Sequence, residues 1–261
     1  MNGIIAELAG LLGLAESLGW AAALAFVRIG AVVALMPGLG DPAVPQRIKL
    51  ALVLAFTLVV APILADRLAA AGTPAPSVLA LGGEAVAGLI LGAGLRLMVM
   101  ALQTAASMIA QATTLSQLFS GTAPEPQPAI GNLFLLTGIT LALVAGLHIR
   151  AAELVLLSYD ILPAGAMPAP NQVADWGLSV ISRSFALAFT LAAPFVIASM
   201  IYNLALGAIN RAMPMLMVSM VGAPALTLGA LAMLAVATPV LLSVWLDAFN
   251  AHLAQPFGTN P

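Results

Sequence analysis

The 261-residue chain has no cysteine, only two histidines and few charged residues, which make up 7% of it. Without cysteine, disulfides, thiolate nucleophiles and cysteine-ligated metal sites are excluded. The histidines, His148 and His252, are far apart in the sequence, and neither belongs to a His-Glu-x-x-His pattern. No Gly-x-x-x-x-Gly-Lys-Ser/Thr loop is present to bind nucleotide phosphates. We therefore expect no cofactor, no metal site and no enzymatic activity.

What the chain has instead is apolar sequence: 62% of its residues are hydrophobic and its mean hydropathy is +1.10. Soluble domains contain about 25% charged residues, so this composition indicates an integral membrane protein. Its 18 prolines and 23 glycines are typical of transmembrane helices rather than of alternating barrel strands. The predicted fold class is all-α, a polytopic membrane helical bundle. Eight basic and ten acidic residues, with no basic run, predict binding neither to nucleic acid nor to anionic lipid.

The apolar runs predict the helices. One span is expected at 20–36, preceded by a separate short helix at 4–18 that lies at the interface or packs on the bundle. Further helices are predicted at 47–64, 78–110, 133–147, 176–210 and 215–249, with an amphipathic surface helix at 148–162. Because one crossing takes roughly 20 residues, the helices at 78–110 and 176–210 must tilt, kink or protrude. The bundle therefore consists of long, kinked hairpins.

The central segment 114–132 contains the one long interior passage that is neither apolar nor helical in pattern. Its spacing Pro124-x-Pro126-x-Pro128 removes backbone donors and favours extended geometry. It predicts a stiff loop, which a membrane expels unless protein or a water-filled cavity houses it. We interpret the chain as a single membrane domain, 1–261, with halves 1–128 and 129–261.

Arg28 lies in the middle of the first predicted span, where a charge is costly. Two hypotheses follow: Arg28 is paired with a neighbouring carboxylate or snorkels to the surface, or it contacts a transported substrate. Arg47 and Lys49 place two positive charges at the start of the next helix. Gly88-x-x-x-Gly92 has the spacing that lets another helix approach closely, and we interpret it as a packing motif.

Two lines of polar residues follow helical spacing inside apolar helices. Either line could form an interhelical hydrogen-bond seam or could line an aqueous passage. The first line consists of Arg96, Gln103 and Ser107, and Gln111 continues it. The second line consists of Ser199, Asn203 and Asn210, and Arg211 follows it. We predict that these residues face a pore or a subunit interface.

Four of the twelve methionines fall within eight residues, at Met213, Met215, Met217 and Met220. Methionine is unbranched and adapts its shape to its surroundings. The cluster therefore fills gaps in the bundle, or forms a deformable seal beside a channel.

An aspartyl protease is a weaker hypothesis, based on Gly38-Leu-Gly-Asp41 and on Tyr159-Asp160. Such chemistry needs two carboxylates that share a water molecule. The order of these motifs is reversed relative to intramembrane proteases, and Asp41 lies in a turn beside Pro42, so the two carboxylates are not expected to meet.

Nine motifs, in order along nearly the whole chain, resemble the FliR family of flagellar export-gate proteins. They are Phe26-Val-Arg28, Met36-Pro37-Gly-Leu-Gly40, Val44-Pro45-Gln-Arg47-Ile-Lys49, Glu84-x3-Gly88-Leu-x2-Gly92, Gln111, Leu147-His148 through Ser158, Leu162-Pro-Ala-Gly165, Gly207-Ala-Ile-Asn-Arg211-Ala-Met-Pro214 and Val221-Gly-Ala-Pro224. Departures from the family pattern occur at Ala106-Ser107, Thr113-Thr-Leu-Ser116 and Met215.

The resemblance implies a non-enzymatic core subunit of the flagellar type III export gate, in the bacterial inner membrane at the flagellar basal body. Its fold would resemble a fused P-type plus Q-type subunit. Its partners would be the membrane subunits FliP and FliQ, the switch protein FlhB, membrane lipid and unfolded flagellar proteins in transit.

In this family the loop after the first long hairpin acts as a plug, which by position corresponds here to 114–132. The plug residues would include Leu115, Leu118, Phe119, Ser120, Gly121, Pro124, Pro126 and Pro128.

Two alternatives remain open. One is the related SctT family of injectisome export proteins, although Asn210-Arg-Ala-Met-Pro214 favours the flagellar branch. The other is a secondary transporter that binds a small substrate through Arg96, Gln103, Asn203 and Asn210. Glu84 is the only carboxylate well inside an apolar run, which argues against a proton-coupled pump.

Overall fold

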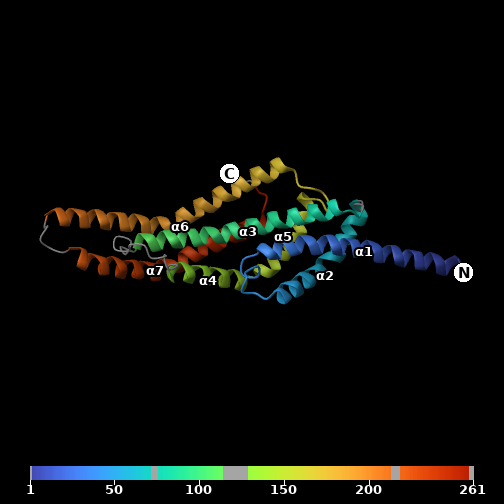
Figure 1. Cartoon of the computed structure of the whole chain (residues 1–261), viewed down its shortest axis with the longest axis horizontal. Helices are drawn as coiled ribbons and strands as arrows, with labels where there is room; N and C mark the ends of the chain where they lie inside the picture. Colours follow the sequence, from blue (N-terminus) through green and yellow to red (C-terminus); the bar gives the residue numbers. More distant parts are fainter. Residues whose placement is uncertain (1, 72–75, 114–128, 213–217, 259–261) are drawn as a thin grey trace. The chain divides into compact units, whose positions relative to one another are not determined.

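The computed structural model describes residues 2–71, 76–113, 129–212 and 218–258, and in these residues it contains seven helices and no strand (Figure 1). The helices are α1 (Asn2–Leu35), α2 (Gln46–Ala71), α3 (Val78–Thr113), α4 (Ala129–Val144), α5 (Leu147–Ile161), α6 (Pro170–Ala212) and α7 (Val218–Ala254). Among the described residues, five helices are long and apolar enough to cross a membrane, or six if the bent pair α4–α5 is one span. The prediction of an all-α polytopic membrane protein is confirmed.

Most helices are longer than predicted, and α1, α2 and α6 extend furthest beyond their predicted bounds. The prediction of a separate helix at 4–18 was wrong, because α1 runs without a break through Gly19. A single glycine costs a helix only about 1 kcal/mol and does not end it. Helix α2 likewise continues beyond residue 64 to Ala71 and contains Pro62. Proline removes one backbone hydrogen bond, and membrane helices tolerate it where neighbouring helices, side chains or local helix adjustments satisfy the freed carbonyl group.

Helices α4 and α5 meet at a bend of 70°. Gly146 lies between them with φ 86°, a left-handed conformation that favours glycine. Helix α5 buries one face and exposes His148, Glu153 and Asp160 on the other. Its predicted amphipathic character is confirmed.

The chain forms two compact units, each built from segments that are distant in the sequence. The first contains residues 1–96, 146–179 and 251–261, and the second contains residues 97–145 and 180–250. The units therefore alternate along the chain. The halves 1–128 and 129–261 stay a prediction.

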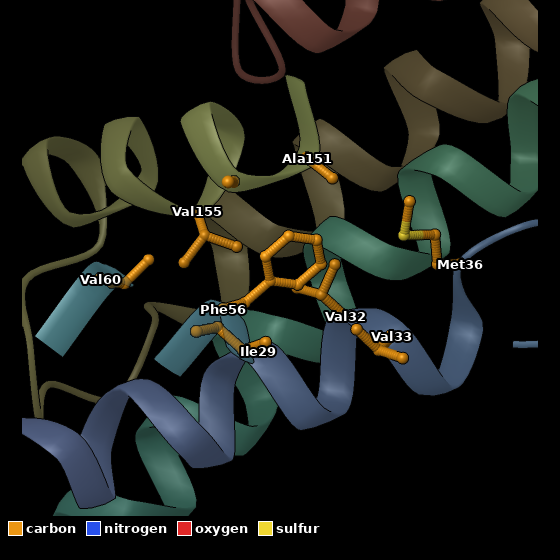
Figure 2. A pocket seen from close by; sticks show the side chains of 9 residues that line it. Ile29, Val32, Val33, Met36, Phe56, Val60, Ala151 and Val155 are labelled. Atoms are coloured by element: carbon orange, nitrogen blue, oxygen red, sulfur yellow. The ribbon is translucent and has the colours of Figure 1, made fainter. Parts of the chain in front are cut away.

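In the first unit, α1, α2 and α5 meet along an apolar seam. Figure 2 shows the Phe56 ring of α2 between Ile29 and Val32 of α1 and Ala151 and Val155 of α5. The remaining cavity has a volume of only about 10 Å³, at the lower limit for one water molecule. The seam is therefore tightly packed and dry.

Helices α1 and α3 approach closely where α3 has glycine. A Cβ atom at Gly88 would overlap the Arg28 carbonyl oxygen, and one at Gly92 would lie 2.9 Å from Leu35 Cβ. The packing role predicted for Gly88-x-x-x-Gly92 is confirmed. The contact places the middle of α1 directly against the first half of α3.

The second unit is organised around Trp245 of α7, which is completely buried. Its indole Nε1 donates a hydrogen bond to the Met98 carbonyl at 2.9 Å, and its ring stacks on Phe249 with the centroids 5.2 Å apart. Gly138 of α4 gives room for Leu102, because a Cβ atom there would overlap the Leu102 side chain. These contacts join α3, α4 and α7 within the unit.

Candidate functional site

Arg28 of α1 and Glu84 of α3 form a buried ion pair, and both side chains are 0% exposed. Arg28 Nε donates to Glu84 Oε2 at 2.7 Å, and Nη2 donates to Oε1 at 3.2 Å. The guanidinium and carboxylate thus form a two-point contact, which fixes orientation as well as separation. Of the two hypotheses for Arg28, the structure shows pairing with a carboxylate.

The remaining guanidinium donors reach the end of α5. Nη1 donates to Ser158 Oγ at 2.9 Å, and Nη2 also donates to the Leu162 carbonyl at 2.9 Å. The Arg28 Cζ atom lies 3.7 Å from the centroid of the Tyr159 ring, a cation–π contact. Every side of the guanidinium therefore meets a polar or aromatic group of the first unit.

Glu84 accepts two further hydrogen bonds from the same region. The backbone N–H of Gly165 donates to Oε1 at 2.7 Å, and the Tyr159 hydroxyl donates to Oε2 at 3.3 Å. We call the six residues of this network the buried lock: Arg28, Glu84, Ser158, Tyr159, Leu162 and Gly165. In the described part of the chain no buried side-chain nitrogen or oxygen lacks a hydrogen-bond partner.

Local backbone geometry makes the buried lock possible. Gly165 has φ 72°, a left-handed conformation that aims its N–H at Glu84 and that a side chain would strain. Gly83 lets the connection between α5 and α6 lie directly on α3, because a Cβ atom at Gly83 would lie 2.6 Å from the Ala166 carbonyl oxygen. The connection between α5 and α6 is thereby attached to α3.

The chemistry of the buried lock is that of a structural element. Opposite charges cancel within it, and each ionised group has several hydrogen bonds, as buried ions require. Removing one member of such a pair leaves the other buried and uncompensated. Within the described residues, no group of three or more His, Cys, Asp or Glu side chains is placed to hold a metal ion.

The predicted polar line on α3 lies largely on the surface of the chain. Arg96, Gln103 and Gln111 are exposed, whereas Ser107 is half-buried and donates to the Thr104 carbonyl at 2.8 Å. Within the part of the chain that the structure describes, Arg96 and Gln103 have no hydrogen-bond or ion-pair partner. These side chains lie free on an apolar helix.

The polar line on α6 is similar. Asn203, Asn210 and Arg211 are exposed near the C-terminal end of the helix, and Arg211 lies in its last turn. Ser199 satisfies its hydroxyl locally by donating to the Val196 carbonyl at 3.2 Å. As on α3, the serine bonds its own helix and the larger polar groups point outward.

Two sets of predicted residues lie outside the described residues. They are the plug residues Leu115, Leu118, Phe119, Ser120, Gly121, Pro124, Pro126 and Pro128, and the methionines Met213, Met215 and Met217. Met220 belongs to α7, but its side chain is also outside the described part.

The carboxylates of the protease hypothesis have different surroundings. Asp160 of α5 accepts a hydrogen bond from Arg67 of α2 at 2.8 Å, in an ion pair that is about half exposed. Asp41 lies in the turn that connects α1 and α2. Each therefore has a local structural context rather than a shared water site.

Sequence reasoning singled out Arg28 and Glu84 separately but did not pair them, and it missed Tyr159 and Gly165 as partners. One signal was available: these are charges of opposite sign, each deep inside an apolar helix. The Gly165 donor is a backbone group, which no residue type reveals.

Comparison with known proteins places these features in context. The family described as "Bacterial export proteins, family 1" matches residues 20–252. A flagellar biosynthetic protein FliR of Caulobacter vibrioides is 34% identical over 241 residues, which cover 90% of this chain and 94% of that protein.

Two more proteins named flagellar biosynthetic protein FliR are similar to this chain. That of Pectobacterium carotovorum is 28% identical, with 87% of this chain and 86% of the relative covered. That of Escherichia coli K12 is 27% identical, with 78% of each covered. Every residue of the buried lock and of both polar lines lies within the matched range 20–252.

Proposed function

The chain belongs to the bacterial export proteins of family 1, and from that premise we propose that, as a subunit of the flagellar type III export gate, it forms part of the membrane pore through which unfolded flagellar proteins leave the cell. The observation that carries the proposal is the match over 90% of the chain to a flagellar biosynthetic protein. We propose a non-enzymatic role in the inner membrane, within the flagellar basal body.

The exposed polar lines support a role inside an assembly. Polar side chains facing hydrocarbon are costly, and in membrane proteins they face other helices or water. Gln103 and Asn203 lie on the surface of this chain, in helices with mean hydropathies of 2.1 and 2.0 over their apolar windows. Neighbouring subunits or an aqueous passage would supply the partners that the chain itself does not provide.

Helix lengths support the same proposal. Helices α6 and α7 contain 43 and 37 residues. At 1.5 Å per residue they extend about 65 Å and 55 Å, whereas the hydrocarbon core of a bilayer is about 30 Å thick. Helices of this length are better suited to an assembly whose subunits wind around a passage than to a simple bundle in which each helix crosses the bilayer once.

The protein works with other components of the flagellar export apparatus. We propose that those in contact with it are the P-type and Q-type membrane subunits FliP and FliQ, and FlhB. Residues 129–132 of the predicted loop belong to α4, so we further propose that the remaining segment 114–128 closes the passage, on the basis of its proline spacing and its place in the sequence.

A deletion strain tests the proposed function. Loss of the gene should abolish both hook formation and secretion of flagellar proteins into the medium, and a plasmid copy of the full chain should restore both. Normal swimming and normal secretion in the deletion strain would contradict the proposal.

A further inference from the structure

A groove lies between α1 and the start of α2, and its lining is apolar along most of its length and polar at one end. Its volume is about 220 Å³. The apolar lining consists of Phe26, Gly30, Val33 and Ala34 of α1 and Leu50 and Val53 of α2. The polar lining consists of Gln46 and Lys49.

The polar end of the groove coincides with the end of a membrane span. The apolar span of α2 runs from Gln46 to Ala70, so Gln46 and Lys49 occupy its first turn. Val53 lies one turn deeper, and a Cβ atom at Gly30 would lie 3.8 Å from its Cγ1 atom. The groove therefore passes from the level of lipid headgroups towards the hydrocarbon, as an amphiphilic ligand requires.

The polar end is also positively charged. Within the described residues, neither Arg47 nor Lys49 takes part in a salt bridge; the pairs Arg28–Glu84 and Arg67–Asp160 involve other residues. Asp41, the acidic residue of the connection before α2, is in neither pair.

Lys49 is nevertheless held in place. Its Nζ donates to the Gly40 carbonyl at 2.7 Å, which uses one of three ammonium donors. The N-terminal end of α2 adds the positive end of a helix dipole at the same level.

We propose that this groove binds one anionic phospholipid of the surrounding membrane. The phosphate group contacts Gln46 and Lys49, with Arg47 beside it. The first methylenes of one acyl chain lie along Phe26, Gly30 and Val33. The composition of the whole chain predicts no affinity for anionic lipid, but the fold places Lys49 at the mouth of an apolar groove, with Arg47 in the same turn of α2.

Native mass spectrometry of the full-length chain in mild detergent tests the proposal. The purified protein is titrated with phosphatidylglycerol or with phosphatidylcholine of the same acyl chains, and bound lipids are counted. One phosphatidylglycerol should be retained per chain, with an affinity about fivefold higher than that of phosphatidylcholine for each cation engaged.

Variants of Lys49 separate charge from packing. Lys49→Gln should remove most of the preference for phosphatidylglycerol, and Lys49→Arg should keep it. Arg150→Gln is the matched control, because it removes one positive charge from the same unit at a position that does not line the groove. Its lipid preference should equal that of the wild type.

Variants of Gly30 test the second part of the proposal, the packing of the acyl chain in the groove. Gly30→Ala should be tolerated, since Val53 lies at ordinary contact distance, whereas Gly30→Leu should fill the groove and weaken the binding of both lipids. Equal affinity for the two lipids, or binding unchanged by both Lys49→Gln and Gly30→Leu, would overturn the proposal. A photoreactive residue at Leu50 that cross-links in cells to protein rather than to lipid would assign the groove to a partner subunit and would also overturn it.

Discussion

At the scale of single residues, the Arg28 guanidinium contacts Glu84, Ser158, Leu162 and Tyr159, and its removal has a predictable cost. Arg28→Ala leaves the Glu84 carboxylate buried without its counter-charge. Such changes cost about 3–5 kcal/mol, a large share of a protein's total stability. We expect a much lower yield of monodisperse protein in mild detergent and a lower midpoint of thermal unfolding, so that assembly fails before transport.

Arg67→Gln is the matched control, because it breaks the other ion pair, in which the two side chains are 42% and 59% exposed. Exposed pairs contribute about 0–1 kcal/mol, so this variant should be close to wild type. If Arg28→Ala gave normal yield and normal complexes but no secretion, the buried lock would not be structural, and Arg28 would instead act in the passage.

At the scale of helices, the α1–α3 contact depends on the absence of a side chain at Gly88. Gly88→Ala should separate the two helices and disturb Arg28, because the added Cβ atom overlaps the Arg28 carbonyl. Gly82→Ala, on the same helix with open space around it, is the control. Thermal unfolding in detergent should show a clear loss for Gly88→Ala and none for Gly82→Ala; equal midpoints would contradict the proposed contact.

The helices were largely predictable from the sequence, because long apolar runs without strong breakers leave few other structures in a membrane. Their ends were less predictable: α1 continues through Gly19, and α2 continues past residue 64 to Ala71. A single glycine costs a helix only about 1 kcal/mol, so it does not end α1.

The buried lock was only partly predictable. The costly charges Arg28 and Glu84 stood out in apolar sequence, but their pairing depends on how α1 and α3 align in space. The Gly165 contribution depends on a backbone angle, and the line Arg96, Gln103, Ser107 showed its shared face but not what that face meets.

At the scale of the whole molecule, the proposed plug makes a separate prediction. Deleting residues 121–127 should leave the assembly intact, because the six residues of the buried lock all lie outside this segment. The closed membrane should then become permeable to ions or small molecules, which dye uptake or conductance would detect. If permeability were unchanged and the yield of complex normal, the segment would only connect the neighbouring helices and would not act as a plug.

The central claim is that this chain functions as one subunit of a multi-subunit export gate, and affinity isolation tests it most directly. The full chain, tagged and expressed from its own locus, is extracted in mild detergent, and the proteins that accompany it are identified by mass spectrometry. Stable co-isolation of the P-type and Q-type export-gate subunits with the chain is the expected result. Recovery of the chain alone, together with solute uptake by the purified protein in liposomes, would contradict it and would support a transporter.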